Sequence, residues 1–257
     1  MTFAPDWLAL REPVDHASRD AGLLARAVAA VGPNAVVVDL GCGTGSSLRA
    51  FGNHPVADWQ WRVVDEDEAL LDIVAKRHPQ SMQVRCNLKD IAALPVKDAD
   101  LVTASALLDL MPRYWVEALA KRLSAERIPF YSALNYNGVM RWSPAHGDDD
   151  AIQVAFNAHQ GTNKGLGPAL GPEAGSATAQ IFADHGYTVF TADSPWRLGP
   201  PEAELQRQLL TGIGAAAQEA GQGAAGAWAQ SRATSAAQGT TYIGHTDVLA
   251  LPRDGGV

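Results

Sequence analysis

Short hydrophobic runs alternate along the chain with segments of helical periodicity. In the first half such runs lie at residues 36–40, 59–65, 82–88, 99–105 and 128–134. Runs of this length bounded by turn residues are typical of buried strands, and helical segments between them are typical of crossover helices. The alternation therefore predicts a doubly wound α/β sheet with parallel strands.

Helix signals separate the predicted strands. Apolar residues recur at helical spacing over Pro13–Val31, which begins with a proline suited to a first turn and ends before Gly32-Pro33. Asp67 is placed to cap a helix that stops before Pro79, and a further helix is expected from Pro112 to about Leu123.

The second half is less regular. After the fifth strand, residues 135–138 read as a turn, leading into a short hairpin that includes residues 139–142. A glycine-rich loop occupies residues 161–172, and glycines around 221–226 divide an alanine-rich segment. The expected elements are helices at 148–160 and 173–185, strands at 187–191 and 240–251, and two helices within 201–237.

A glycine motif follows the first predicted strand. Gly41, Gly43 and Gly45 are spaced by two residues, and Asp39 stands two residues before the first of them. The dinucleotide fingerprint requires glycines at relative positions 0, 2 and 5, so this spacing disfavours a nicotinamide site. The D-x-G-x-G-x-G arrangement resembles motif I of the class I S-adenosylmethionine (SAM) dependent methyltransferases.

The resemblance implies a fold and a division of the chain. It implies a Rossmann-like, doubly wound sheet of seven mostly parallel strands in a single domain over residues 1–257. Residues 13–135 would form the cofactor-binding core, with helical insertions after strand five and between strands six and seven. These insertions, residues 136–180 and 200–238, are expected on the substrate side.

Cofactor contacts follow from the same resemblance. Asp65 ends the second strand, where a carboxylate can accept hydrogen bonds from both ribose hydroxyls. Asn87 with Leu88 would meet the adenine, with Asp90 as the alternative. A leading helix would lie over the cofactor, so Arg19 or Arg11 could bind its carboxylate, unless these arginines are a solvated helix face. The expected cofactor-binding positions are Arg19, Asp39, Gly41, Cys42, Gly43, Gly45, Asp65, Glu66, Asn87, Leu88 and Ser105.

Composition narrows the range of partners. The net charge is −8, which argues against nucleic acid as a partner because phosphates would be repelled. No apolar run has membrane-spanning length, and no signal-peptide pattern opens the chain. Cys42 and Cys86 form no disulfide or metal-ligand pattern, so no metal site is expected. A cytoplasmic location is the default expectation.

The methyl acceptor is less defined than the cofactor. Asp109 could orient or deprotonate an acceptor, although it could equally cap a loop. Tyr136 follows strand five, where substrate groups are commonly held. His159 is a candidate base at a helix end, with a structural histidine as the alternative. Further polar and aromatic candidates on the same side of the sheet are Ser105, Asn135, Trp142, Asn157, Lys164 and Trp196.

These observations predict an enzyme that transfers a methyl group from SAM to an oxygen or nitrogen of a small molecule. The alternative is a SAM-binding regulatory or non-methylating protein on the same fold. A protein methyltransferase and an NAD-dependent oxidoreductase are weaker alternatives. The acceptor and the oligomeric state are left open by the sequence.

Overall fold

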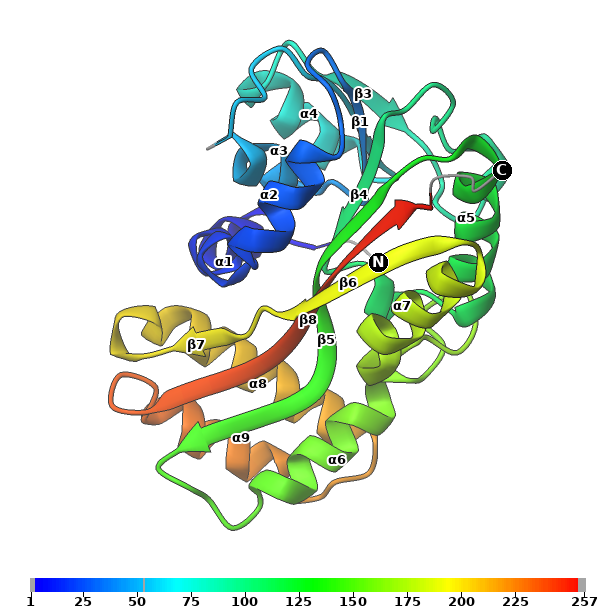
Figure 1. Ribbon diagram of the computed structural model, residues 1–257. Coiled ribbons are helices and arrows are strands. Elements are labelled where there is room, and N and C mark those ends of the chain that lie inside the picture. Colours follow the sequence, from blue (N-terminus) through cyan, green and yellow to red (C-terminus); the bar gives the residue numbers. More distant parts are fainter. Residues whose placement is uncertain (1–2, 53, 254–257) are drawn as a thin grey trace.

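The computed structural model describes residues 3–52 and 54–253, and Figure 1 shows their arrangement. One twisted sheet runs through them in the order β3-β2-β1-β4-β5-β8-β6, and the short strand β7 also pairs with β8. The pairs from β3 to β5 are parallel, whereas β8 is antiparallel to β5, β6 and β7. The strands are β1 (Val36–Leu40), β2 (Gln60–Asp65), β3 (Met82–Arg85), β4 (Leu101–Ser105), β5 (Phe130–Ser143), β6 (Tyr187–Asp193), β7 (Trp196–Leu198) and β8 (Thr240–Pro252).

The Rossmann-like sheet expected from the sequence is confirmed, and β7 is a strand beyond the expected seven. The α-helices are α1 (Pro5–Ser18), α2 (Ala21–Ala29), α3 (Ser46–Phe51), α4 (Glu68–Arg77), α5 (Arg113–Glu126), α6 (Asp149–Gln160), α7 (Ala174–Asp184), α8 (Ala203–Glu219) and α9 (Ala225–Thr234). Single 3-10 turns occur at η1 (Ile91–Ala93), η2 (Leu108–Leu110), η3 (Gly171–Glu173) and η4 (Pro200–Glu202). No helix in the described ranges is long and apolar enough to cross a membrane.

Helices cover both faces of the sheet. Buried side chains of α5 and α7 pack on one face, where Trp115, Leu119 and Phe182 contact the strands. Side chains of α2, α3 and α4 form a second core on the opposite face, around Phe51 and Trp61. This two-sided burial explains why β1 reads as a nearly continuous hydrophobic run.

The distal halves of β5 and β8 extend beyond this sheet and carry a third core (Figure 1). Trp142 of β5, Trp228 of α9 and Ile243 of β8 are buried there against α6 and α8. The expected turn and hairpin at residues 135–142 are therefore wrong, because β5 continues to Ser143 through two register shifts. Asn135 Nδ2 donates to the Thr246 carbonyl, and Asn137 Oδ1 accepts from Val139 N, so side chains satisfy backbone groups beside the irregularities.

The expected single helix over residues 13–31 is also wrong. α1 begins at Pro5, contains Pro13 in its interior, and ends at Ser18, while α2 begins at Ala21. Asp20 separates them with extended backbone, and its side chain caps α2 by accepting from Leu23 N. The Asp20 backbone N–H donates to the buried carboxylate of Asp247, which fixes the break against β8.

A buried ion pair joins three elements of the third core. Arg232 of α9 donates to both carboxylate oxygens of Asp149 at the start of α6, at 2.6 and 2.5 Å. Trp228 Nε1 donates to the same carboxylate, and Arg232 Nη1 donates to the Pro144 carbonyl after β5. Removal of either charged side chain would leave the other without its counter-charge in a site that is largely closed to solvent.

We expect Arg232→Ala to lower the free energy of unfolding by about 3 kcal/mol, because it leaves the partly buried carboxylate of Asp149 without its counter-charge. Arg85→Ala is the matched control, since Arg85 pairs with Glu68 on an exposed surface and should cost less than about 1 kcal/mol. Urea unfolding of both variants measures the difference. An equal loss of unfolding free energy in the two variants would show that burial does not determine how much each ion pair contributes to stability.

Candidate functional site

The carboxyl ends of β1, β2 and β4 meet at one edge of the sheet because the strands are parallel and nearly in register. Leu40 at the end of β1 pairs with Val64 of β2 on one side and Ala104 of β4 on the other. The residues that follow each strand therefore converge. The glycine loop after β1, Asp65 at the end of β2 and Ser105 at the end of β4 surround the same space.

The glycine loop needs glycine for two reasons. Gly41, Gly43 and Gly45 have φ of +66°, +54° and +87°, a region that favours glycine. A Cβ on Gly41 would lie 3.1 Å from Leu107, and one on Gly43 would lie 3.3 Å from Leu8. The loop is thus tightly covered, and Gly45 N closes it by donating to the Cys42 carbonyl at 2.9 Å.

Asp65 connects the end of β2 to this loop. Its Oδ2 accepts from Gly43 N at 2.9 Å, and its Oδ1 accepts from Asp67 N at 3.0 Å. Burial raises the pKa of Asp65, and these backbone hydrogen bonds oppose the rise. The carboxylate is therefore held in one orientation at the wall of the cavity, with lone pairs left on both oxygens.

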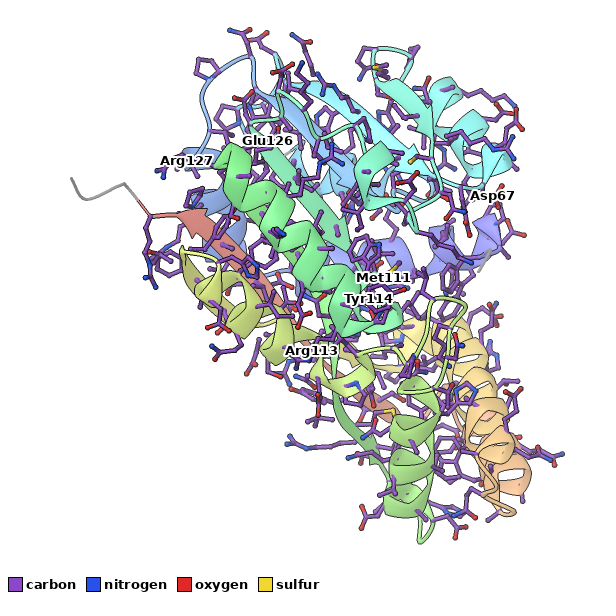
Figure 2. All side chains as sticks on the ribbon, turned by 90° about the vertical axis from the view of Figure 1, so that its right-hand side faces the viewer. Asp67, Met111, Arg113, Tyr114, Glu126 and Arg127 are labelled. Atoms are coloured by element: carbon purple, nitrogen blue, oxygen red, sulfur yellow. The ribbon has the colours of Figure 1, made fainter. Side chains whose placement is uncertain are left out.

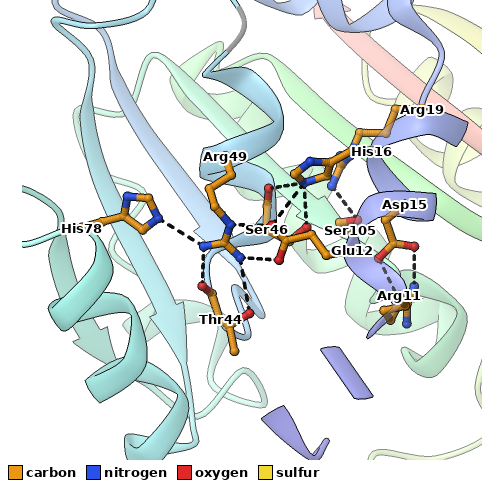
Figure 3. A network of polar contacts seen from close by, with 10 residues as sticks. All are labelled: Arg11, Glu12, Asp15, His16, Arg19, Thr44, Ser46, Arg49, His78 and Ser105. Carbon is orange, nitrogen blue, oxygen red and sulfur yellow. Dashed lines mark hydrogen bonds and ion pairs between the residues drawn. The ribbon is translucent and has the colours of Figure 1, made fainter. Parts of the chain in front are cut away.

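Helix α1 is fastened over the glycine loop by a polar network (Figure 3). Arg49 of α3 donates to both oxygens of Glu12 at 2.5 Å and to the Thr44 carbonyl at 2.7 Å. His16 Nε2 lies 3.0 Å from the Ser46 carbonyl. As a result, Leu8, Arg11 and Asp15 of α1 form one wall of the cavity that the glycine loop opens into.

A second charged pair lies on the same wall. Arg11 Nε donates to Asp15 Oδ2 at 2.9 Å, and Trp196 Nε1 donates to Asp15 Oδ1 at 2.9 Å. The Arg11 guanidinium also lies over the Trp196 ring, 4.9 Å from its centroid. These contacts join α1 to β7, so the wall is anchored at both the sheet and the third core.

The loop after α6 and the segment after β4 complete the cavity. Lys164, Gly165 and Leu166 lie along one side, and Leu107, Leu110 and Met111 give it an apolar surface. The predicted positions that line the cavity are Gly41, Cys42, Gly43, Asp65, Glu66, Asn87, Leu88 and Ser105.

Part of the chain is similar to a known protein family. Residues 37–125 match the family model described as a methyltransferase domain. Over these residues the chain is similar to methyltransferase domains. No curated protein matches the chain in sequence at a significant level.

Solved structures resemble this chain in fold at low sequence identity. The cyclopropane synthase MmaA2 from Mycobacterium tuberculosis has a TM-score of 0.53 at 12% identity, over 96% of this chain and 94% of that one. A cyclopropane-fatty-acyl-phospholipid synthase-like protein from Lactobacillus casei has a TM-score of 0.51 at 16% identity, over 93% and 92%. For a possible exported protein from Bordetella parapertussis the TM-score is 0.50 at 14% identity, over 90% of this chain and 66% of the other.

Three predicted cofactor positions lie behind the cavity wall. Gly45 shapes the loop and begins α3. Arg19 is buried, and its Nη2 donates to Ser105 Oγ at 3.0 Å, so it reaches the cavity only through Ser105. Asp39 is buried within β1, and neither of its oxygens has a hydrogen-bond partner in the described part of the chain.

The three predicted catalytic residues also lie outside the cavity lining. Asp109 lies in η2 with Oδ1 shielded from solvent and without a partner among the described residues, and burial raises its pKa to about 6. Tyr136 donates to Asn157 Oδ1 at 2.6 Å, and burial raises its pKa above the ordinary value. His159 lies between Glu219 and Lys164, with contacts to both ring nitrogens.

Several lining residues were not singled out from the sequence. Leu8, Leu107, Leu110 and Met111 carry no chemical signature, and only their place in the fold brings them to the cavity. Thr44, Ser46 and Ser47 also line the cavity, and their position beside the glycines could have indicated them.

Burial raises the pKa of Asp39 to about 7, and the nearby charge of Arg19 only partly opposes this. The folded protein therefore holds a proton on Asp39 that the unfolded chain loses at about pH 4. The free energy of unfolding should fall as the pH rises from 4 to 7, by up to about 4 kcal/mol from this residue.

Urea unfolding at pH 4, 6 and 8 tests this. Asp39→Asn should show a shallower decline than the wild type, whereas Asp72→Asn on the exposed side of α4 should follow the wild type. An unchanged slope in Asp39→Asn would exclude Asp39 as the titrating group.

Proposed function

We propose that the protein transfers the methyl group of SAM to an oxygen or nitrogen of a small-molecule acceptor and releases S-adenosylhomocysteine. One observation carries the proposal. A single cavity joins the glycine loop, Asp65 and Asn87 to an apolar wall of Leu107, Leu110 and Met111. A cofactor on the first set of residues would thus present its methyl group toward the second set.

Each part of the cofactor has a matching group in this cavity. The main chain at Gly41 and Gly43, which lines the cavity, would bind the methionine part. Asp65 has free lone pairs for the ribose hydroxyls. Asn87 and Leu88 would face the adenine, and Trp115 Nε1 steadies this segment by donating to the Leu88 carbonyl at 2.6 Å.

The chemistry is an in-line displacement. The lone pair of the acceptor atom forms a bond to the methyl carbon while the sulfur–carbon electron pair returns to sulfur, which neutralises the sulfonium. A hydroxyl or ammonium acceptor must also lose a proton. Alignment in a shielded cavity can supply about 7–11 kcal/mol of the barrier in well-oriented cases.

The cover over the cavity favours a small acceptor. α1 closes one side, and the loop within residues 136–180 closes another through Lys164 and Leu166. We assign the segments 136–180 and 200–238 to the substrate side of a single domain. Residues 200–238 contribute to the cover indirectly, because Glu219 of α8 contacts His159. The alternative, a SAM-binding protein without transfer, would bind SAM but form no S-adenosylhomocysteine with any acceptor.

We expect Asp65→Ala to weaken S-adenosylhomocysteine binding by on the order of tenfold or more, because it removes a charged acceptor of hydrogen bonds. Asp72→Ala is the matched control and should bind as the wild type does. Isothermal titration calorimetry measures the affinities, and circular dichroism checks that the variants are folded. Wild-type protein that binds NAD but no adenosyl ligand would overturn the proposal.

We expect Asp109→Asn to reduce turnover by about 10²–10⁴-fold if Asp109 accepts the acceptor proton. Because its pKa is raised to about 6, wild-type kcat/KM should increase as the pH rises through about 6 and then level off. S-adenosylhomocysteine release, with an acceptor found by screening small metabolites, measures both effects. A variant with wild-type turnover and pH profile would remove Asp109 from the mechanism.

A further inference from the structure

The loop over the cavity is ordered by its own hydrogen bonds. Asn163 Oδ1 accepts from Gly165 N at 2.8 Å and from Gly167 N at 2.9 Å. Tyr114 at the start of α5 donates to the Leu166 carbonyl at 2.7 Å, and Figure 2 shows Tyr114 beside Met111 at this end of the helix. The loop therefore holds Lys164 and Leu166 at fixed places along the cavity.

The hydrogen-bond partners of Lys164 determine the state of His159. A lysine ammonium can only donate, so its 3.2 Å contact with His159 Nδ1 requires a lone pair on that nitrogen. The ring proton then lies on Nε2, which donates to Glu219 Oε2 at 3.0 Å. His159 thus bridges Glu219 and Lys164 and orients the ammonium, for which the described residues offer no further hydrogen-bond partner.

Lys164 differs from Arg11, which also lines the cavity, in its charged partners. Arg11 is paired with Asp15 at 2.9 Å, whereas no carboxylate lies within 4.0 Å of Lys164 Nζ in the ranges 3–52 and 54–253. The surrounding wall is apolar, formed by Leu107, Leu110, Met111 and Leu166. Partial burial lowers the pKa of Lys164, while Glu219 and Asp109 counteract this and favour the charged form.

We propose that Lys164 binds a carboxylate or phosphate group of the methyl acceptor, and that His159 and Glu219 position it for this contact. The inference rests on the proposed function, because it assigns a substrate class to the same cavity. An ammonium with free donors beside an apolar wall is suited to a short acceptor with one anionic end and an apolar body.

The test uses protein saturated with S-adenosylhomocysteine and titrates matched pairs of probes. Hexanoate is compared with hexanamide, and hexyl phosphate with hexanol, by thermal shift and calorimetry. The variants are Lys164→Met, Lys164→Arg and the control Lys89→Met, because Lys89 lines the same cavity beside Asn87. Affinity for S-adenosylhomocysteine is measured first in every protein.

We expect the wild type to bind at least one anionic probe, and to bind it on the order of tenfold more tightly than its neutral partner. Lys164→Met should lose that preference, Lys164→Arg should keep most of it, and Lys89→Met should be unchanged. The stronger of hexanoate and hexyl phosphate identifies the anion. Wild type that binds no anion preferentially, or Lys164→Met that retains the preference, would overturn the inference.

The two proposals fail in different ways. Wild-type protein that does not bind S-adenosylhomocysteine would overturn the proposed function. Normal binding of that ligand without an anion preference would overturn only the role of Lys164. For the positioning role, His159→Ala should weaken anion binding, and His159→Asn, which keeps a hydrogen-bond acceptor, should restore part of it. Equal anion affinity in the wild type, His159→Ala and His159→Asn would exclude the positioning role of His159.

Discussion

The geometry of the site depends on the hydrogen bonds that the carboxylate of Asp247 accepts. This carboxylate is fully buried in β8, accepts from Leu134 N at 2.8 Å and from Asp20 N at 3.0 Å, and accepts from the Tyr131 hydroxyl at 3.1 Å. Two departures from regular structure, the irregularity in β5 and the break between α1 and α2, are therefore fixed by one side chain. The first directs β5 toward the third core, and the second lays α1 across the glycine loop.

Three carboxyl groups near the carboxyl ends of the parallel strands have raised pKa values. Burial raises the pKa of Asp39, Asp65 and Asp109, which means that the folded chain tolerates their negative charge poorly without a partner. SAM carries a positive sulfonium, so its binding would offset part of that cost. In the protein alone, this cost makes the free energy of unfolding decline as the pH rises.

The two covers over the cavity are held by different parts of the molecule. α1 is fastened to the glycine loop through Glu12 and Arg49 and to β7 through Asp15 and Trp196. The loop with Lys164 is fastened to α5 by Tyr114 and to α8 by His159. The third core therefore contacts both covers of the cavity, although it lies away from the glycine loop. The position of the loop with Lys164 thus depends on the stability of α6, α8 and α9.

The sequence by itself determined the Rossmann-like sheet and the glycine loop, because these depend on local periodicity and on glycine at positive φ. Eight of the predicted cofactor positions line the cavity. It did not reveal the break at Asp20 or the continuation of β5, where contacts with Asp247 and Thr246 override local turn and helix signals. Only the tertiary structure brought Leu107, Met111 and Lys164 to one cavity and gave His159 its two partners. Such contacts join residues far apart in the chain, and no spacing along the sequence encodes them.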